Sequence, residues 1–262
     1  ETGVINGRGS DVLQVAGEGG LGEALAANLR AAGHWCAVSQ DLVDAMDALA
    51  GAPGAGRLVP NGVETDRFHP RDRAACRART GHGDDPLVLV VGHLIPRKDP
   101  QLALAAFAAG APADARLAFV GRGPLEAELR TAIEDAGLEA RVALLGEQPP
   151  DELAVLYGAA DLLVLTSWRE GRPNVVLEAL ASGLPVLATA AGGTAEVLDD
   201  PRMLATDRDA EALGRGIASL LADPPSTESL VARVAHLSWD ASLEALEGVL
   251  GAARDATREV AR

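Results

Sequence analysis

The sequence predicts an α/β fold, in which a doubly wound parallel sheet is accompanied by a partial second domain. From Pro86 onward, short apolar segments alternate with segments whose apolar residues recur at helical spacing. Strands that alternate with helices require right-handed crossovers and therefore a parallel sheet. The expected strands are 87–92, 116–121, 141–146, 161–167 and 185–189, and the helices between them lie near 100–109, 124–136, 151–159 and 174–182.

Composition limits the possible functions. The chain has 262 residues, of which 48% are of apolar type, enough for one or two α/β domains with a sizeable core. Its formal net charge of −15 argues against a surface for nucleic acid or for anionic membranes, because such surfaces need clustered Lys and Arg. Any phosphate-binding site must therefore be local.

The cysteine and histidine patterns indicate neither disulfides nor a metal. Cys36 and Cys76 have no metal-binding spacing, and the five histidines form no HxxxH or HExxH pair. A reducing, cytoplasmic setting is expected. No apolar run reaches the length of a transmembrane helix, and the missing initial Met suggests a chain that begins within a longer protein.

The two ends of the chain differ from its regular middle. In the first 66 residues a loop at 7–12 is followed by expected helices at 23–33 and 40–51, with strands at 34–39 and near 56–60. This is too little for a sheet covered on both faces, so we interpret residues 1–66 as the remnant of a domain and a linker. Near the other end, 211–223 and 238–250 read as helices, and 251–262 as a mobile polar end.

One strand, loop and helix most strongly predict a ligand site. Asn174 occupies the expected N-cap position of the helix after the strand 161–167, so the amides of the next three residues would be free to bind an anion. Glu178, one turn into the helix, would lean back toward neutral hydroxyls, and Glu170 could approach the same ligand from the loop. A glutamate in a first helical turn often only complements the helix dipole, and a glutamate on a loop is often only solvated. The spacing alone therefore leaves both interpretations open.

Two further loops follow expected strands. Residues 92–99 read GHLIPRKD and place Arg97 and Lys98 where they could neutralise a diphosphate or could be ordinary surface charges. Residues 121–126 read GRGPLE, which lacks the third glycine of a dinucleotide fingerprint. A nicotinamide-dependent oxidoreductase is further excluded because Gly121 stands where the acidic residue for the ribose would be.

Taken together, these segments resemble a known family. The pieces PNGVETDRFHP, VGHLIPRKD, FVGRGPLE, VALLGEQPPDELAVLYGAADLLVLTS, EGRPNVVLEALASGLPVLAT and GGTAEV follow one another between residues 56 and 246. In this order they resemble the C-terminal, donor-binding half of a retaining GT-B glycosyltransferase of group 1, also called family 4. The resemblance implies a Rossmann-like domain at 67–237, an incomplete N-terminal acceptor domain at 1–66, and a C-terminal helix at 238–262 that packs back toward the N-terminal domain.

The resemblance also implies roles for particular residues. Lys98 would bind the donor diphosphate, Glu178 the ribose hydroxyls, and Glu170 the sugar near the reacting centre, which makes Glu170 the catalytic candidate. The loop 147–149 would lie beside the base. The remaining residues implied to bind the nucleotide sugar are Gly92, Arg97, Gln148, Arg172, Pro173, Asn174 and Val175. No cofactor or metal is expected, because cationic side chains and the helix end would supply the positive potential.

Three features depart from the family pattern. His93 stands where many members have an Arg that contacts the diphosphate. Asp99 replaces the usual Gly, which is either harmless on a loop or brings a negative charge near the phosphate. The segment after GGTAEV, residues 198–213, lacks the usual glycine-containing loop. The face toward the partner domain is therefore expected to be altered.

The resemblance implies a hexosyltransferase that moves a sugar from a nucleotide-diphosphate sugar to a saccharide or lipid-linked acceptor, with retention of configuration, in cell-envelope polysaccharide synthesis. The alternative is a truncated module that binds the nucleotide sugar without transferring it. Neither nucleic acid nor a transmembrane segment is expected, and peripheral membrane contact would come through the missing domain. A GT-B epimerase or phosphorylase fits the EGRPNVVLE segment less well.

Overall fold

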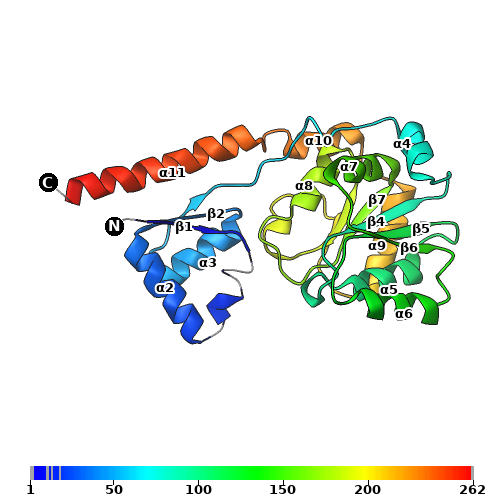
Figure 1. Ribbon diagram of the computed structural model, residues 1–262, viewed down its shortest axis with the longest axis horizontal. Helices are drawn as coiled ribbons and strands as arrows, with labels where there is room; N and C mark the ends of the chain where they lie inside the picture. The colour runs from blue at the N-terminus through cyan, green and yellow to red at the C-terminus, as the bar shows by residue number, and fades with distance from the viewer. Residues whose placement is uncertain (1–2, 10–11, 13, 18, 261–262) are drawn as a thin grey trace.

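The computed structural model contains two parallel sheets that lie side by side along the long axis of the molecule (Figure 1). It describes residues 3–9, 12, 14–17 and 19–260. The larger sheet has the strand order β6-β5-β4-β7-β8-β9, and the smaller has the order β1-β2-β3. The strands of the larger sheet are β4 (Leu87–Val91), β5 (Arg116–Val120), β6 (Val142–Gly146), β7 (Leu162–Leu165), β8 (Val186–Thr189) and β9 (Leu204–Ala205).

The larger sheet is doubly wound, which confirms the predicted fold class. Its first strand, β4, lies in the middle, paired in parallel with β5 on one side and β7 on the other. The chain adds β5 and β6 on one side of β4 and then crosses back to add β7 on the other side. In the sheet, the point of reversal therefore lies between the neighbouring strands β4 and β7. In sheets of this kind ligands bind outside the carboxyl ends of the strands, at the point of reversal.

Helices cover both faces of this sheet. They are α4 (Arg73–Thr80), α5 (Pro100–Gly110), α6 (Glu126–Asp135), α7 (Pro150–Ala159), α8 (Asn174–Ala181), α9 (Ala210–Ala222) and α10 (Thr227–Val234), with short 3₁₀ turns η2 (Pro96–Lys98) and η3 (Gly192–Thr194). Figure 1 shows α5 and α6 below the sheet and α7 and α10 above it. Because both faces are covered, the central strands consist almost entirely of buried Val and Leu.

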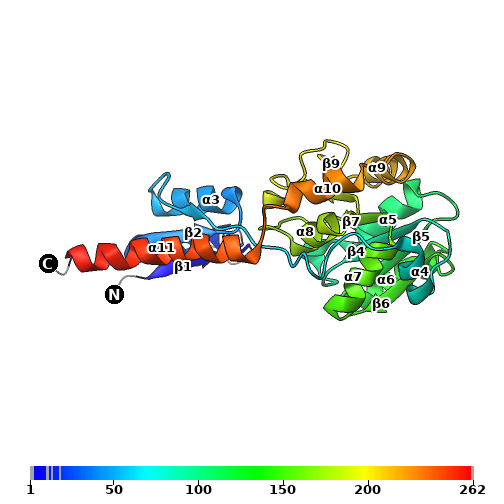
Figure 2. The same cartoon turned by 90° about the horizontal axis from the view of Figure 1, so that it is seen from above.

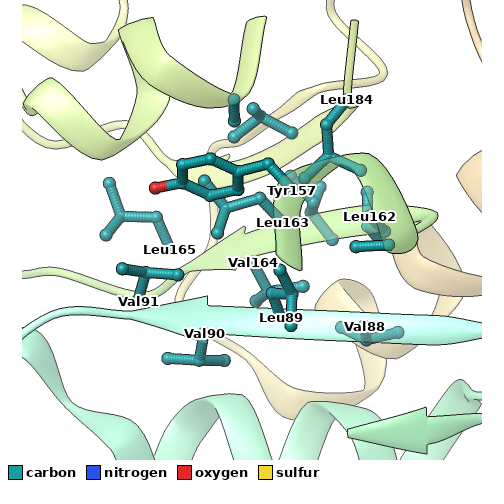
Figure 3. Close-up of a cluster of buried hydrophobic side chains, with 14 of the residues drawn as sticks. Val88, Leu89, Val90, Val91, Tyr157, Leu162, Leu163, Val164, Leu165 and Leu184 are labelled. Carbon is teal, nitrogen blue, oxygen red and sulfur yellow. The ribbon is translucent and has the colours of Figure 1, made fainter. Parts of the chain in front are cut away.

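A tyrosine hydroxyl lies at the edge of the core of the larger sheet. Figure 3 shows Tyr157 of α7 lying over β7 beside Leu163, with its hydroxyl oxygen at the edge of the cluster. The ring is buried and packs edge to face on Phe68, with 5.9 Å between the ring centroids. A buried tyrosine hydroxyl needs a hydrogen-bond partner, and it finds one in α8, next to the candidate site.

The smaller sheet carries helices on both of its faces. Its elements are β1 (Val4–Gly7), η1 (Val15–Gly17), α2 (Gly20–Ala32), β2 (His34–Ala37), α3 (Gln40–Ala50) and β3 (Arg57–Leu58). In Figure 1 α2 and α3 lie below this sheet and the long helix α11 (Trp239–Val260) runs above it. Figure 2, seen from above, shows α11 running along β1 and β2. Val249 of α11 packs on Cys36 of β2 and on Val59.

The expectation of a mobile polar end at 251–262 was wrong for residues 251–260, which continue α11. Ala, Arg and Glu in this stretch favour helix, and Ala253 is buried. Residues 261–262 lie outside the described residues. Among the described residues no helix is both long and apolar enough to cross a lipid bilayer, and this includes the 22-residue α11.

Several elements had no clear pattern in the sequence, namely β1, β9, α4 and α10. Helix α4 reads RAACRART, too polar to show an apolar stripe. It is fixed instead by Arg77, which is buried, pairs with Asp161 at 2.7 Å and donates to the carbonyl oxygens of Ala159 and Gly83. A buried arginine needs such a full set of partners, and only the fold brings them together.

Candidate functional site

A cavity of about 460 Å³ lies at the carboxyl ends of β4, β5 and β6. The amino end of α8 closes one side, and the smaller sheet's unit contributes Arg8, while Asn61 comes from the linker. Strand ends bring Gly92 and Gly121 to its floor, both with positive φ (145° and 135°). A side chain at Gly121 would meet the carbonyl oxygen of Gly92 at 2.1 Å, so glycine is required for the two strand ends to approach each other.

A buried carboxylate lies in this cavity between two cations. Glu170 is only 7% exposed, and its Oε1 accepts from Lys98 Nζ at 2.5 Å. Its Oε2 lies 3.6 Å from Nη1 of Arg97. Lys98 lines the cavity, whereas Arg97 lies outside it and also donates to the carbonyl oxygen of Arg169. Lys98 can therefore contact an anionic ligand directly, and it fixes the position of the Glu170 carboxylate.

Helix α8 directs its amino end at the cavity, but the expected cap was wrong. Pro173 is the N-cap and Asn174 is the first helical residue. The Oδ1 of Asn174 accepts a hydrogen bond from Asn61 Nδ2 at 2.8 Å, so this side chain ties the linker to α8. The amides of Val176 and Leu177 share the carbonyl oxygen of Pro173. Within the described residues the amides of Asn174 and Val175 have no partner, which leaves them for a ligand oxygen.

Arg172 joins the cavity wall to the smaller sheet's unit. Its Nε donates to the carbonyl oxygen of Val38 at 2.8 Å, and its Nη2 pairs with Glu196 at 3.0 Å. The same Glu196 carboxylate accepts the amides of Gln40 and Asp41, each at 3.0 Å, at the start of α3. Burial lowers the pKa of Arg172, and Glu196 opposes that shift. Arg172 therefore acts mainly as a structural link in this structure.

One more cation faces the cavity. Arg122, directly after β5, lines the cavity, and the part of the chain that the structure describes offers its guanidinium no hydrogen-bond or ion-pair partner. Gln148 also lines the cavity, and its Nε2 donates to the carbonyl oxygen of Leu145 at 2.7 Å. The cavity thus carries Lys98 and Arg122, and the Arg122 guanidinium lies close to the end of β6, where a Cβ on Gly146 would be 3.6 Å from its Nε.

The family follows from comparison with known sequences. Residues 72–236, well over half of the chain, match the profile of the family described as glycosyl transferases group 1. The chain belongs to this family. The D-inositol 3-phosphate glycosyltransferase of Acidothermus cellulolyticus is similar, with 36% identity over 231 residues, which are 82% of this chain and 51% of that protein.

Two further comparisons agree with membership of the group 1 glycosyltransferases. A GDP-mannose-dependent α-(1-6)-phosphatidylinositol monomannoside mannosyltransferase of Mycolicibacterium smegmatis is 34% identical over 72% of this chain and 53% of its own. Sucrose-phosphate synthase from Thermosynechococcus elongatus superposes with a TM-score of 0.81 and 28% identity, covering 97% of this chain and 68% of that one. The expected GT-B architecture is thereby confirmed. The chain spans about half the length of the curated relatives it matches.

Most of the site residues proposed from the group 1 motifs line the cavity. Arg97 and Glu178 do not line it, whereas the other residues proposed from the sequence do: Gly92, Lys98, Gln148, Glu170, Arg172, Pro173, Asn174 and Val175. Arg8, Asn61 and Arg122 were missed. Arg8 lies far from the motifs in sequence, Asn61 belongs to the motif PNGVETDRFHP but was given no role, and the strand-end position of Arg122 in GRG was a usable signal.

One of the departures from the family pattern, Asp99, has a structural explanation. Asp99 adopts a left-handed φ of 49°, the conformation for which glycine is usual, and it is not among the residues that line the cavity. It caps α5 through the amide of Leu102 and pairs with Arg208 at 2.6 Å. The negative charge of Asp99 is therefore balanced by Arg208. His93 does line the cavity. Among the described residues no group of His, Cys, Asp and Glu could hold a metal ion.

Glu178 lies one helical turn behind the cavity rim. It is half-buried, and Tyr157 donates its hydroxyl to Oε2 at 3.1 Å. Burial raises the pKa of Glu178, and the hydrogen bond from Tyr157 partly offsets that shift. Burial and the same carboxylate raise the pKa of Tyr157 well above its usual value. The carboxylate already has one hydroxyl donor and can accept another from the side of the cavity.

Glu178→Gln is expected to gain stability relative to the unchanged chain as pH rises. The pKa of Glu178 is raised in the folded state, so ionisation of this carboxyl destabilises the fold at high pH. This destabilisation disappears as the pH falls toward the pKa of Glu in the unfolded chain, about 4.3. Glutamine mimics the neutral form and still accepts from Tyr157. Urea midpoints measured between about pH 4 and 8 should diverge toward high pH. Glu228→Gln, on an exposed position of α10, is the matched control, and a difference for Glu178→Gln that does not vary with pH would contradict the burial argument.

Proposed function

We propose that this chain forms the donor-binding half of a glycosyltransferase that moves a hexose from a nucleotide-diphosphate sugar to a saccharide or lipid-linked acceptor, with retention of configuration. The observation that carries the proposal is the convergence of Lys98, Arg122 and the free amides of α8 on one cavity at the reversal point of the sheet. Cations and amides that converge in this way suit a diphosphate.

Stabilisation of the departing diphosphate is the main requirement of the proposed reaction. As the bond from the sugar to the diphosphate breaks, negative charge grows on the leaving oxygen, and Lys98 and the α8 amides would stabilise it. Positive charge grows on the sugar ring, and the buried carboxylate of Glu170 would hold the sugar hydroxyls beside the reacting carbon. Glu178 would accept from the ribose, and the loop containing Gln148 would lie beside the base. We propose that no metal is needed, because these groups already supply the positive potential.

The similar proteins support a nucleotide-sugar donor. The relative from Mycolicibacterium smegmatis is named for its dependence on GDP-mannose and for a phosphatidylinositol mannoside acceptor. On this basis we infer a role in cell-envelope polysaccharide synthesis. Cys36 and Cys76 are both buried free thiols, which suits the reducing cytoplasm, where we propose that the protein acts.

A thermal-shift screen tests the proposal. The chain is melted in EDTA with UDP, GDP and ADP, with their glucose and mannose conjugates, and with the matching nucleosides. A ligand of the folded state at a concentration 100 times its Kd adds about 2.7 kcal/mol to the free energy of unfolding. We expect one diphosphate and its conjugates to raise the melting temperature and its nucleoside to leave it unchanged. Equal shifts by nucleoside and diphosphate, or no shift with any of them, would refute the diphosphate assignment.

A further inference from the structure

A second feature lies beside the donor cavity and has no part in the function proposed above. Trp168, in the loop between β7 and α8, is 59% exposed, although an aromatic ring of this size is normally buried. It lies two residues before Glu170, and its backbone amide donates to the carbonyl oxygen of Arg97 at 2.8 Å. The loop that holds the buried carboxylate therefore also holds an exposed indole.

The exposed indole is held in a fixed position from one side. The guanidinium carbon of Arg208 lies 3.8 Å from the centroid of the Trp168 ring, at cation–π distance. Arg208 itself is fixed by Asp99 at 2.6 Å and by the carbonyl oxygens of Thr166 and Ser167, each at 2.8 Å. One face of the ring is thus covered by an anchored cation, which pre-organises the ring for a ligand on the other side.

A second cavity, of about 320 Å³, adjoins this ring. Its lining residues are Gln14, Pro96, Arg97, Trp168 and Arg169. Arg97 belongs to this cavity and lies 3.6 Å from the Glu170 carboxylate, which belongs to the donor cavity. The Arg97–Glu170 pair therefore links the lining of one cavity to that of the other, and a group held on Trp168 would lie next to the loop that contains Glu170.

We propose that Trp168 and Arg97 form an acceptor subsite, in which a sugar ring of the acceptor stacks on the indole and its hydroxyls accept from Arg97. Sugar rings present a face of polarised C–H groups, which suits the negative face of an aromatic ring, and a guanidinium that offers only donors suits hydroxyl oxygens. This inference rests on the proposed transfer function, since it names the second substrate's binding site. The ligand class is a neutral saccharide.

Calorimetric titration with maltose, mannobiose and sucrose tests this inference, using the full chain saturated with the diphosphate found by the thermal-shift screen. We expect at least one saccharide to bind. Trp168→Ala should weaken that binding about three- to tenfold, the range for loss of one aromatic contact, while Trp168→Phe retains most of it. Trp239→Phe changes another exposed tryptophan, at the start of α11, which lines neither cavity, and is the matched control.

The outcomes separate the two proposals. Loss of saccharide binding in Trp168→Ala, with diphosphate affinity unchanged, supports the subsite. Equal saccharide affinity in Trp168→Ala and the unchanged chain overturns it, as does failure of all three saccharides to bind a chain that binds the diphosphate. If no diphosphate binds, the proposed function fails first, and titration of the saccharides without nucleotide then decides the subsite by the same comparison.

Discussion

Lys98→Ala is expected to weaken the binding of nucleoside diphosphate by about one to two orders of magnitude, because a hydrogen bond to a charged group contributes about 1.5–3 kcal/mol. The substitution removes a cation from the cavity, and it also leaves the Glu170 carboxylate without its partner at 2.5 Å. The anionic ligand would then meet a carboxylate whose remaining cation is Arg97, at 3.6 Å and outside the cavity, so repulsion between the two negative charges would increase. Isothermal calorimetry with the diphosphate selected by the thermal-shift screen measures the effect.

Two matched variants make the Lys98 result specific. Arg97→Ala removes the neighbouring cation, which lies outside the cavity, and should weaken diphosphate binding less than Lys98→Ala does. Adding Glu170→Gln to Lys98→Ala should restore part of the lost affinity, because it removes the repulsion but not the missing contact. If Lys98→Ala and the unchanged chain bind with equal affinity, the assignment of this end of the cavity to the diphosphate is wrong.

Gly193→Ala is expected to destabilise the junction between the two sheets and to weaken diphosphate binding. An added Cβ at Gly193 would lie 1.9 Å from the carbonyl oxygen of Gly171 and 2.5 Å from Cβ of Ser39. Neither atom lies at the end of a flexible side chain, so the loop that contains Glu170 or the start of α3 must move. Overpacking of this kind costs about 1–3 kcal/mol, and more where backbone must move. Urea denaturation and calorimetry with the diphosphate measure the two effects.

Gly248→Ala is the matched control for this substitution. Gly248 lies inside α11, and an added Cβ there meets no atom within 4 Å. Because alanine favours helix over glycine by about 1 kcal/mol, this variant should be slightly more stable than the unchanged chain and should bind the diphosphate equally well. A Gly193→Ala protein that behaves like Gly248→Ala would show that the close approach at Gly171 does not constrain the site.

The regular middle of the chain was predictable because its signals are local. Each buried strand, such as β4, is a short run of Val and Leu, and each is followed by a helix with recurring apolar positions. Two-sided burial leaves that pattern in the sequence. The segment 170–178 could likewise be placed at the ligand-binding edge, because a loop after a parallel strand can only emerge there.

The partners of individual polar side chains were less predictable. Asn174 had the residue type and position of an N-cap, yet it binds Asn61, a residue far away in sequence. Asp99 had the charge to repel a phosphate, yet its carboxylate pairs with Arg208. Both outcomes depend on which side chains the fold brings within hydrogen-bond distance, and spacing along the chain carries no such information.

By itself the sequence determined the α/β class, the succession along the chain of strands β4 to β8 and helices α5 to α9, and the loops that carry Lys98 and Glu170, because backbone periodicity and strand burial act over a few neighbouring residues. Only the tertiary structure decided that Lys98 and Glu170 pair, that Arg8 and Asn61 reach the same cavity, and that Trp168 rests on Arg208. These contacts join residues separated by tens of positions or more, and they exist because packing of the two sheets brings distant loops to one edge.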